Sequence, residues 1–160
     1  MEIVYNARSP KPDFENDLGA KRVELDEALS TADFISLHVP LSEETHHLID
    51  ERRLRLIKPT GYLINTARGP IVDEAALVRV LKDKAFAGAG LDVYEREPQL
   101  EPGLAELPNT FLLPHLGSAT IGTRSAMGVL AARNLLSVLG DERPANPVNP
   151  AVLDEPHTGQ

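Results

Sequence analysis

Residues 61–74, GYLINTARGPIVDE, contain the end of a strand, a sharp turn and the start of a helix. The apolar run Gly61–Ile64 is typical of a buried strand, and Asp73 is a suitable N-cap for a helix that begins at Glu74. Arg68 therefore stands where a strand ends, directly before a glycine. A permanently charged guanidinium in such a turn is either a solvated loop residue or part of a site for an anion.

The same alternation of short apolar runs and helical patterns extends from this segment in both directions. Strands are predicted at Ile3–Asn6, Phe34–Val39, Gly61–Thr66, Gly88–Val93 and Thr110–Leu113. Helices are predicted at Pro12–Leu18, Leu25–Ser30, Glu51–Leu56, Glu74–Asp83 and Thr120–Leu139. No strand alternates strictly between polar and apolar residues, which is typical of parallel strands covered on both faces. We therefore expect an α/β fold with a parallel sheet.

The last predicted helix carries a stripe of residues, all apolar except Asn134, at spacings of three and four residues. Its members are Met127, Leu130, Ala131, Asn134, Leu135 and Val138. This spacing predicts a face that packs against the sheet, with a contact between subunits as the alternative. After Gly140 the composition turns to proline and asparagine, in RPANPVNP at residues 143–150. Such a segment cannot build a core, so we expect a linker or a docking strand.

The composition limits the class of protein. A chain of 160 residues, 42% hydrophobic and 25% charged, is long enough for the core of one soluble domain. The 24 acidic residues outnumber the 16 basic ones, which argues against a nucleic-acid partner. There is no long apolar run, no signal-peptide pattern at Met1–Tyr5 and no cysteine. The lack of cysteine excludes disulfides, thiol nucleophiles and cysteine-ligated zinc, and we expect a cytoplasmic protein without a membrane partner.

Chemically active side chains fall at the carboxyl ends of the predicted strands, where doubly wound sheets bind ligands. They are His38, Arg68, Asp92, Glu95, Glu97 and His115. Arginine binds a carboxylate through two hydrogen bonds, and a histidine beside a carboxylate exchanges a proton with a hydroxyl. The combination favours reduction of a 2-oxo acid or oxidation of a 2-hydroxy acid. A metal site built from Asp92, Glu97 and His115 is the weaker alternative, because their spacing is not diagnostic.

Small residues follow the same strands. Gly69 and Gly117 stand where the backbone must turn tightly or approach a ligand. Ser118 and Thr120 precede the last helix, where free amides favour phosphate or another anion. For either hydroxyl, N-capping of the helix is the alternative role.

Two blocks of sequence resemble the D-isomer-specific 2-hydroxyacid dehydrogenases. They are NTARGPIVDEAALVRVLKDKAFAGAGLDVYEREP at residues 65–98 and LLPHLGSAT at residues 112–120. The resemblance extends from VYNARSP to NPVNP, and YNAR and HLGSAT are most similar to glyoxylate/hydroxypyruvate reductases. It implies a Rossmann-like, doubly wound parallel sheet, a small 2-oxo acid as substrate, and a homodimer.

The resemblance also implies roles for individual residues. Arg68 would bind and polarise the substrate, His115 would be the general acid and base, and Glu97 would be its carboxylate partner. The residues implied on the adenosine side of the cofactor are His38, Val39, Pro40 and Thr45. Those implied on the nicotinamide side are Thr66, Ala67, Arg68, Asp92, His115, Gly117 and Ser118, with Asp92 holding the carboxamide.

The choice of cofactor depends on the residues after the first strand. An NAD enzyme usually presents an acidic residue there, to bind the ribose 2′-hydroxyl. Here the strand is followed by Arg8 and Ser9, and no carboxylate occurs before Asp13. Arg8 can pair with a 2′-phosphate, so we expect NADPH to be preferred, with NAD as the alternative cofactor and a solvated Arg8 as the alternative role.

The chain departs from the family in one large respect. The glycine-rich phosphate loop, GxGxxG, is absent, and Gly88, Gly90 and Gly103 do not replace it because they open no helix after a first strand. We expect residues 1–140 to form a partial NAD(P)-binding domain that lacks its first strand–helix unit. Residues 141–160 would be a tail that leads towards a missing substrate domain. The chain would then be the second half of a longer enzyme and weakly active alone.

Two alternatives to a glyoxylate/hydroxypyruvate reductase stay open. One is another D-2-hydroxyacid dehydrogenase, such as D-3-phosphoglycerate dehydrogenase, because the segment that selects the substrate is not in this sequence. The other is a non-catalytic binding or dimerisation module.

Overall fold

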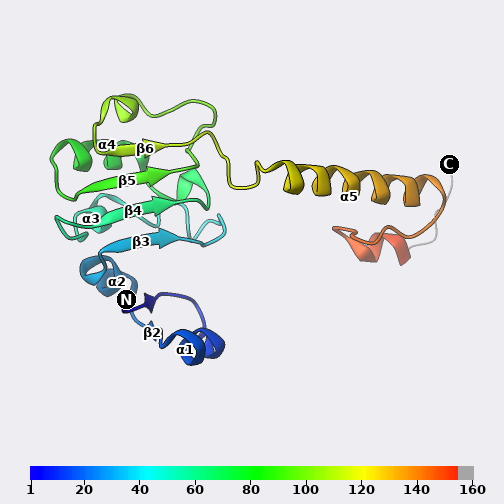
Figure 1. Cartoon of the computed structure of the whole chain (residues 1–160), viewed down its shortest axis with the longest axis horizontal. Helices are drawn as coiled ribbons and strands as arrows, with labels where there is room; N and C mark the ends of the chain where they lie inside the picture. Colours follow the sequence, from blue (N-terminus) through cyan, green and yellow to red (C-terminus); the bar gives the residue numbers. More distant parts are fainter. Residues whose placement is uncertain (155–160) are drawn as a thin grey trace. The chain divides into compact units, whose positions relative to one another are not determined.

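A parallel sheet of four strands forms the centre of the first part of the chain (Figure 1). The structure, a computed structural model, describes residues 1–154. The strands are β3 (Phe34–Leu37), β4 (Tyr62–Asn65), β5 (Gly88–Leu91) and β6 (Thr110–Leu112), in the order β3-β4-β5-β6. Leu37 pairs with Asn65, and Asn65 pairs with Leu91. The carboxyl ends of neighbouring strands therefore lie side by side, and the expected α/β fold with a parallel sheet is confirmed.

Three helices supply the core on one face of this sheet. They are α2 (Leu25–Thr31), α3 (Glu51–Leu54) and α4 (Glu74–Lys82), and two short 3-10 helices lie at Gly69–Ile71 (η1) and Leu104–Glu106 (η2). Leu29, Leu54 and Leu77, one from each α-helix, are fully buried in one cluster with Leu63 of β4. Asp73 caps α4 through a 2.8 Å hydrogen bond from a backbone amide, as its position before Glu74 predicts.

The opposite face of the sheet is exposed. Phe34 and Phe111 are each 68% exposed and Tyr62 is 45% exposed, whereas Ile35 and Leu63 point into the core. The rings of Phe34 and Tyr62 stack with their centroids 5.7 Å apart. The strands carry apolar residues on both faces, and the helices of the first unit, residues 1–117, cover only one of them. Within this unit the expectation that both faces are covered is wrong.

The first strand does not join the main sheet. β1 (Val4–Tyr5) pairs in parallel with β2 (Lys21–Arg22), and α1 (Pro12–Leu18) connects them. The hydroxyl of Tyr5 donates to Glu15 of α1, and its ring meets Phe14 edge-on. Val4 and Tyr5 are only partly buried, because two strands cannot enclose a core. The expectation that the strand predicted at Ile3–Asn6 belongs to the main sheet is therefore wrong. β2 consists of two exposed charged residues, so no apolar pattern could have predicted it.

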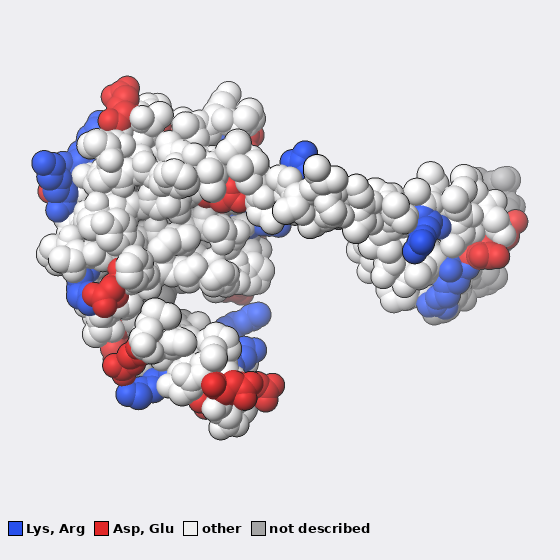
Figure 2. All heavy atoms as spheres, in the orientation of Figure 1, with Lys and Arg blue, Asp and Glu red and all other residues white. Residues whose placement is uncertain are grey.

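The described residues from Ser118 to Asp154 belong to a second compact unit, dominated by α5 (Ile121–Leu139), with a short 3-10 helix η3 at Pro150–Asp154. Thr120 caps α5, as expected for a hydroxyl at that position, by accepting a 3.1 Å hydrogen bond from the amide of Thr123. No residue of α5 is buried, and Met127 and Leu135 are both more than half exposed. Figure 2 shows few charged side chains along this helix.

The apolar stripe of α5 therefore forms no core with the described residues of its own unit. Packing of this stripe against the sheet remains a prediction. A contact between subunits remains a prediction, as does a functional boundary after residue 140. None of the helices described between residues 1 and 154 has the length and apolar character of a membrane span.

Candidate functional site

The turn that carries Arg68 is held by the last residue of β4. Asn65 is 1% exposed, and its side chain donates to the carbonyl of Arg68 at 3.0 Å and accepts from the amide of Ala67 at 3.1 Å. These two bonds replace the strand pairing that ends here. The Arg68 side chain is exposed and donates to the carbonyl of Ala67 at 2.6 Å. The turn thus presents a fixed cation at the carboxyl edge of the sheet.

Gly69 allows this turn to contact a second loop. A Cβ atom at Gly69 would lie 1.9 Å from the carbonyl carbon of Tyr94 and 2.4 Å from the amide nitrogen of Glu95. Both neighbours are backbone atoms, which cannot rotate away. Only glycine permits this approach, and it brings Arg68 next to the loop at residues 94–97.

Replacing Gly69 with alanine is expected to separate the two loops. The clash with backbone at 1.9 Å has no flexible side chain to absorb it. We expect the free energy of unfolding to fall by about 3 kcal/mol, at the upper end of overpacking effects. Urea denaturation of the 160-residue chain measures this, with Gly122→Ala in α5 as control, because a Cβ there meets no atom within 4 Å. A loss for Gly69→Ala no larger than for the control would contradict the close packing.

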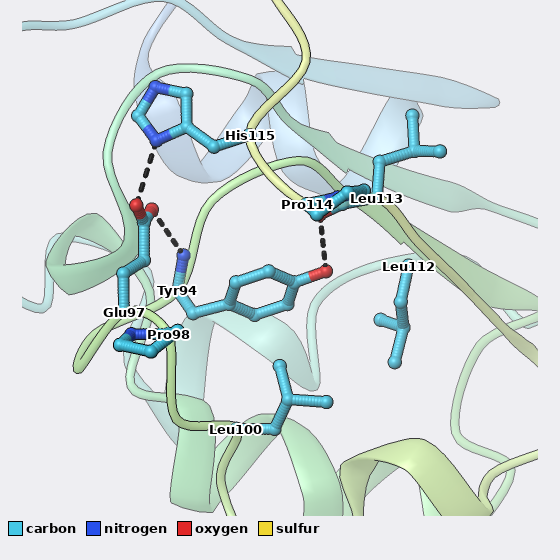
Figure 3. A pocket seen from close by; sticks show the side chains of 8 residues that line it. All are labelled: Tyr94, Glu97, Pro98, Leu100, Leu112, Leu113, Pro114 and His115. Atoms are coloured by element: carbon cyan, nitrogen blue, oxygen red, sulfur yellow. Dashed lines mark hydrogen bonds and ion pairs between the residues drawn. The ribbon is translucent and has the colours of Figure 1, made fainter.

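Glu97 and His115 form a hydrogen-bonded ion pair at this edge (Figure 3). His115 Nδ1 lies 2.8 Å from Glu97 Oε2, and the amide of Tyr94 donates to Glu97 Oε1 at 3.1 Å. His115 has φ 55°, a left-handed conformation that turns its side chain back towards the 94–97 loop. The hydrogen bond with His115 is the main cause of a lowered pKa of Glu97, and the charge of Arg68 also lowers it. The structure thus brings Arg68, Glu97 and His115 together.

The ring of Tyr94 anchors the same loop. Its hydroxyl donates to the carbonyl of Leu113 at 2.7 Å and to that of Leu91 at 3.3 Å, and the side chain is buried. Burial is the main reason that the pKa of Tyr94 is raised, so this phenol stays a neutral donor. A pocket of about 340 Å³ opens here, lined by Tyr94, Glu97, Pro98, Leu100, Leu112, Leu113, Pro114 and His115 (Figure 3).

Asp92 organises the loop that follows His115. It is 5% exposed, and its two carboxylate oxygens accept from the amides of Leu116 at 2.6 Å and Gly117 at 2.8 Å. No group of three His, Cys, Asp or Glu residues in the described part of the chain is placed to hold a metal, so the alternative metal site is not formed there. A hydrogen bond from Asp92 to a nicotinamide carboxamide remains a prediction, as does the role of Ser118, which belongs to the second unit.

The residues expected on the adenosine side follow β3. His38 bonds to Ser36 at 2.8 Å through Nε2, and Val39 and Pro40 continue the chain from the sheet edge. Thr45 closes this loop, since its hydroxyl donates to the carbonyl of Pro40 at 2.7 Å. Thr66 and Ala67 follow β4 directly and so lie at the same edge of the sheet.

Arg8 and Ser9 lie beyond β1, outside the main sheet. Arg22 of β2 fixes this turn by donating to the carbonyls of Ala7 at 2.9 Å and Arg8 at 3.3 Å. The pKa of Glu44 is lowered mainly by its hydrogen bond with Ser42, and to a smaller degree by the charge of Arg8. Arg8 is therefore close enough to the loop after β3 for its charge to act on Glu44. Among the described interactions, no direct contact joins Arg8 to Arg68, Glu97 or His115.

Two residues near the site, Glu74 and His47, were not expected from the sequence. Glu74, Glu95 and His47 form a hydrogen-bonded cluster beside the 94–97 loop. Glu74 stands in a first helical turn, where an acidic residue is ordinary, so its burial gives no signal in the sequence. His47 has a left-handed backbone conformation, with φ 49°. No pattern of apolar or charged residues in the sequence indicates such a conformation.

Comparisons with known proteins agree with these observations. Residues 1–117 match the family model described as "D-isomer specific 2-hydroxyacid dehydrogenase, NAD binding domain". The glyoxylate reductase of Thermococcus onnurineus is 50% identical over 154 residues, which are 96% of this chain and 46% of that protein. The glyoxylate/hydroxypyruvate reductase B of Enterobacter agglomerans is 46% identical over 154 residues, 96% of this chain and 48% of that protein. The chain thus spans about half the length of these curated relatives.

Solved structures give the same result. The TT0316 protein of Thermus thermophilus is 47% identical, with a TM-score of 0.83 over 93% of this chain and 46% of that one. An NADPH-dependent glyoxylate/hydroxypyruvate reductase of Sinorhizobium meliloti, in complex with NADP and malonate, is 37% identical, with a TM-score of 0.81. That match covers 92% of this chain and 45% of the other.

Proposed function

Because the chain belongs to the D-isomer-specific 2-hydroxyacid dehydrogenase family, we propose that it supplies the catalytic and cofactor-binding part of an NADPH-preferring glyoxylate/hydroxypyruvate reductase. The observation that carries this proposal is the Glu97–His115 ion pair beside Arg68. These are the groups that reduction of a 2-oxo acid needs at its carboxylate and its carbonyl oxygen.

Each of the three residues has a defined task in this reaction. Arg68 binds the carboxylate of the 2-oxo acid and draws electron density from the neighbouring carbonyl. Glu97 holds the ring of His115 through Nδ1, and the imidazolium form of His115 gives a proton to the carbonyl oxygen as that carbon is reduced. In the reverse direction, His115 takes the proton from the hydroxyl. NADPH, when bound, supplies the hydride.

The residues of this chain fit part of such a cofactor. Arg8 and Ser9 would hold the 2′-phosphate, the loop from His38 to Thr45 would flank the adenosine, and Thr66, Ala67, Asp92, Gly117 and Ser118 would flank the nicotinamide. The diphosphate has no glycine-rich loop in this sequence. Losing about three charge-assisted hydrogen bonds, each worth about 1.5–3 kcal/mol, lowers affinity by several powers of ten. We therefore propose that the 160-residue chain alone binds NADPH weakly and has little activity.

The test is a chimera that joins this chain to the part of the Thermococcus onnurineus glyoxylate reductase that it does not match. Turnover of glyoxylate and hydroxypyruvate with NADPH supports the proposal. A preference for 3-phosphohydroxypyruvate would instead favour a D-3-phosphoglycerate dehydrogenase. Micromolar binding of NADPH by the 160-residue chain, followed by nucleotide fluorescence, would contradict the proposed weak binding.

Replacing Arg8 with alanine in the chimera is expected to reduce the preference for NADPH over NADH by about 10–100-fold, the value of one charge-assisted hydrogen bond. The measurement is kcat/KM for each cofactor. Lys11→Ala is the matched control, because it removes a nearby exposed cation. An equal effect of both variants would show that the 2′-phosphate is recognised by the general positive charge of this region and not by Arg8.

A second candidate function, a non-catalytic dimerisation module, draws on the exposed apolar residues of α5. It accords with the proposed homodimer and with a functional division into a partial cofactor domain at residues 1–140 and a tail at 141–160. The absence of cysteine fits a reducing, cytoplasmic compartment. A folded chain that dimerises in analytical ultracentrifugation, while the chimera shows no turnover, would favour this candidate.

A further inference from the structure

Two glutamates hold each other's backbone beside the Glu97–His115 pair. Glu95 Oε1 accepts a 2.9 Å hydrogen bond from the amide of Glu74, the first residue of α4. In return, Glu74 Oε1 accepts a 2.9 Å hydrogen bond from the amide of Glu95. His47 Nε2 lies 2.9 Å from Glu95 Oε1 and joins the cluster from a third segment. We call this cluster of Glu74, Glu95 and His47 the glutamate clasp.

The start of α4 does not need this arrangement. Asp73 is the N-cap and already satisfies the amide of Ala76. Glu74 is only 3% exposed. Burying a carboxyl group lowers the stability of the fold unless hydrogen bonds compensate for its lost hydration. Burial raises the pKa of Glu74 to about 7, and its bond to the Glu95 amide partly offsets that rise. An exposed glutamate in the first helical turn would give the same helix stabilisation without this cost.

The clasp acts on the loop that carries Glu97. Gly69 packs against the peptide between Tyr94 and Glu95, and Glu74 bonds to the amide of that same peptide. The peptide is therefore held by α4 and by the Arg68 turn together. The next amide upstream, that of Tyr94, donates to the Glu97 side chain. Fixing this peptide consequently fixes the carboxylate that faces His115.

We propose that Glu74 and Glu95 are positioning residues, which lock the 94–97 loop and thereby hold Glu97 against His115. The catalytic consequence of this lock rests on the proposed function, but the lock itself is a property of the 160-residue chain. It is tested without turnover.

The experiment uses the 160-residue chain and two NMR measurements. Hydrogen exchange reports the amide of Glu95, and a carbon-13 titration reports the pKa of the Glu97 carboxyl. In the unmodified chain we expect a protected Glu95 amide and a Glu97 pKa below its ordinary value. Glu74→Ala is expected to accelerate exchange of the Glu95 amide by about tenfold or more and to move the Glu97 pKa back towards its ordinary value.

A conservative variant and a control make the result decisive. Glu74→Gln keeps an oxygen that can accept a hydrogen bond from the Glu95 amide. Its amide exchange rate at Glu95 and its Glu97 pKa are therefore expected to stay close to those of the unmodified chain. Glu27→Ala removes an exposed glutamate from the first turn of α2 and is expected to change neither. Equal acceleration of core amides such as that of Leu63, or a Glu97 pKa that does not respond to Glu74→Ala, would overturn the proposal. An inactive chimera with the expected NMR results would contradict the proposed function and leave the clasp intact.

Discussion

Replacing His115 with asparagine is expected to lower kcat for hydroxypyruvate reduction by the chimera about 10²–10⁴-fold. Asparagine accepts the left-handed backbone that His115 adopts at φ 55°, so the loop geometry should persist. It cannot transfer a proton to the carbonyl oxygen. The loss should therefore appear in kcat, with KM for the 2-oxo acid changed little, because Arg68 still binds the carboxylate.

The control for this variant is His46→Asn, which alters an exposed histidine that stacks on His47 and has no bond to Glu97. We expect its kcat to stay near that of the unmodified chimera. A His115→Asn chimera that retained more than about a tenth of its kcat would show that proton transfer does not pass through His115.

The second large effect concerns stability and pH. The pKa of Glu74 is raised from 4.5 to about 7 in the folded chain, first by burial, and also by the charges of Glu95 and Glu101, while Arg96 opposes the rise. His47 faces the same cluster through its bond with Glu95. Between these two pKa values the folded state binds more protons than the unfolded state. The free energy of unfolding therefore falls as pH rises from 4.5 to 7.

The size of this decrease follows from the two pKa values. Their difference corresponds to about 3 kcal/mol as an upper value, at about 1.4 kcal/mol per unit. Urea denaturation of the chain and of Glu74→Gln across this range measures it, because glutamine cannot ionise. We expect the variant to gain stability relative to the unmodified chain as pH rises. Parallel curves for the two proteins would refute the raised pKa, and Glu27→Gln should run parallel to the unmodified chain.

Much of the first unit could be predicted from local pattern. The strands at β3 to β6 and the capped start of α4 follow from apolar runs and from Asp73, since these signals act within a few residues. Arg68, Glu97 and His115 were predicted because parallel strands place their carboxyl ends at one edge. Their proximity depends on that topology and on Gly69, which the sequence marks as a tight turn.

Other features depend on neighbours that no local pattern specifies. The apolar residues of β1 and α5 predict burial, but a pattern says only that a face is apolar and not what covers it. The glutamate clasp joins Glu74 and Glu95, 21 residues apart, through backbone amides, and it adds His47, 48 residues from Glu95, through a bond between side chains. Backbone donors are present at every position except proline, so such a bond leaves no trace in the sequence.

The backbone of His115 carries a final consequence. A histidine at φ 55° stores strain on the order of 1–3 kcal/mol, which asparagine or glycine would relieve. A selection for thermal robustness would therefore discard this histidine, whereas a selection for turnover would retain it. At some positions, two such screens rank the same substitutions in opposite order. The native side chain at such a position is retained for catalysis and not for stability. A saturation library at residue 115 of the chimera, sorted once for thermal robustness and once for turnover of hydroxypyruvate, would therefore show whether this position is kept for chemistry.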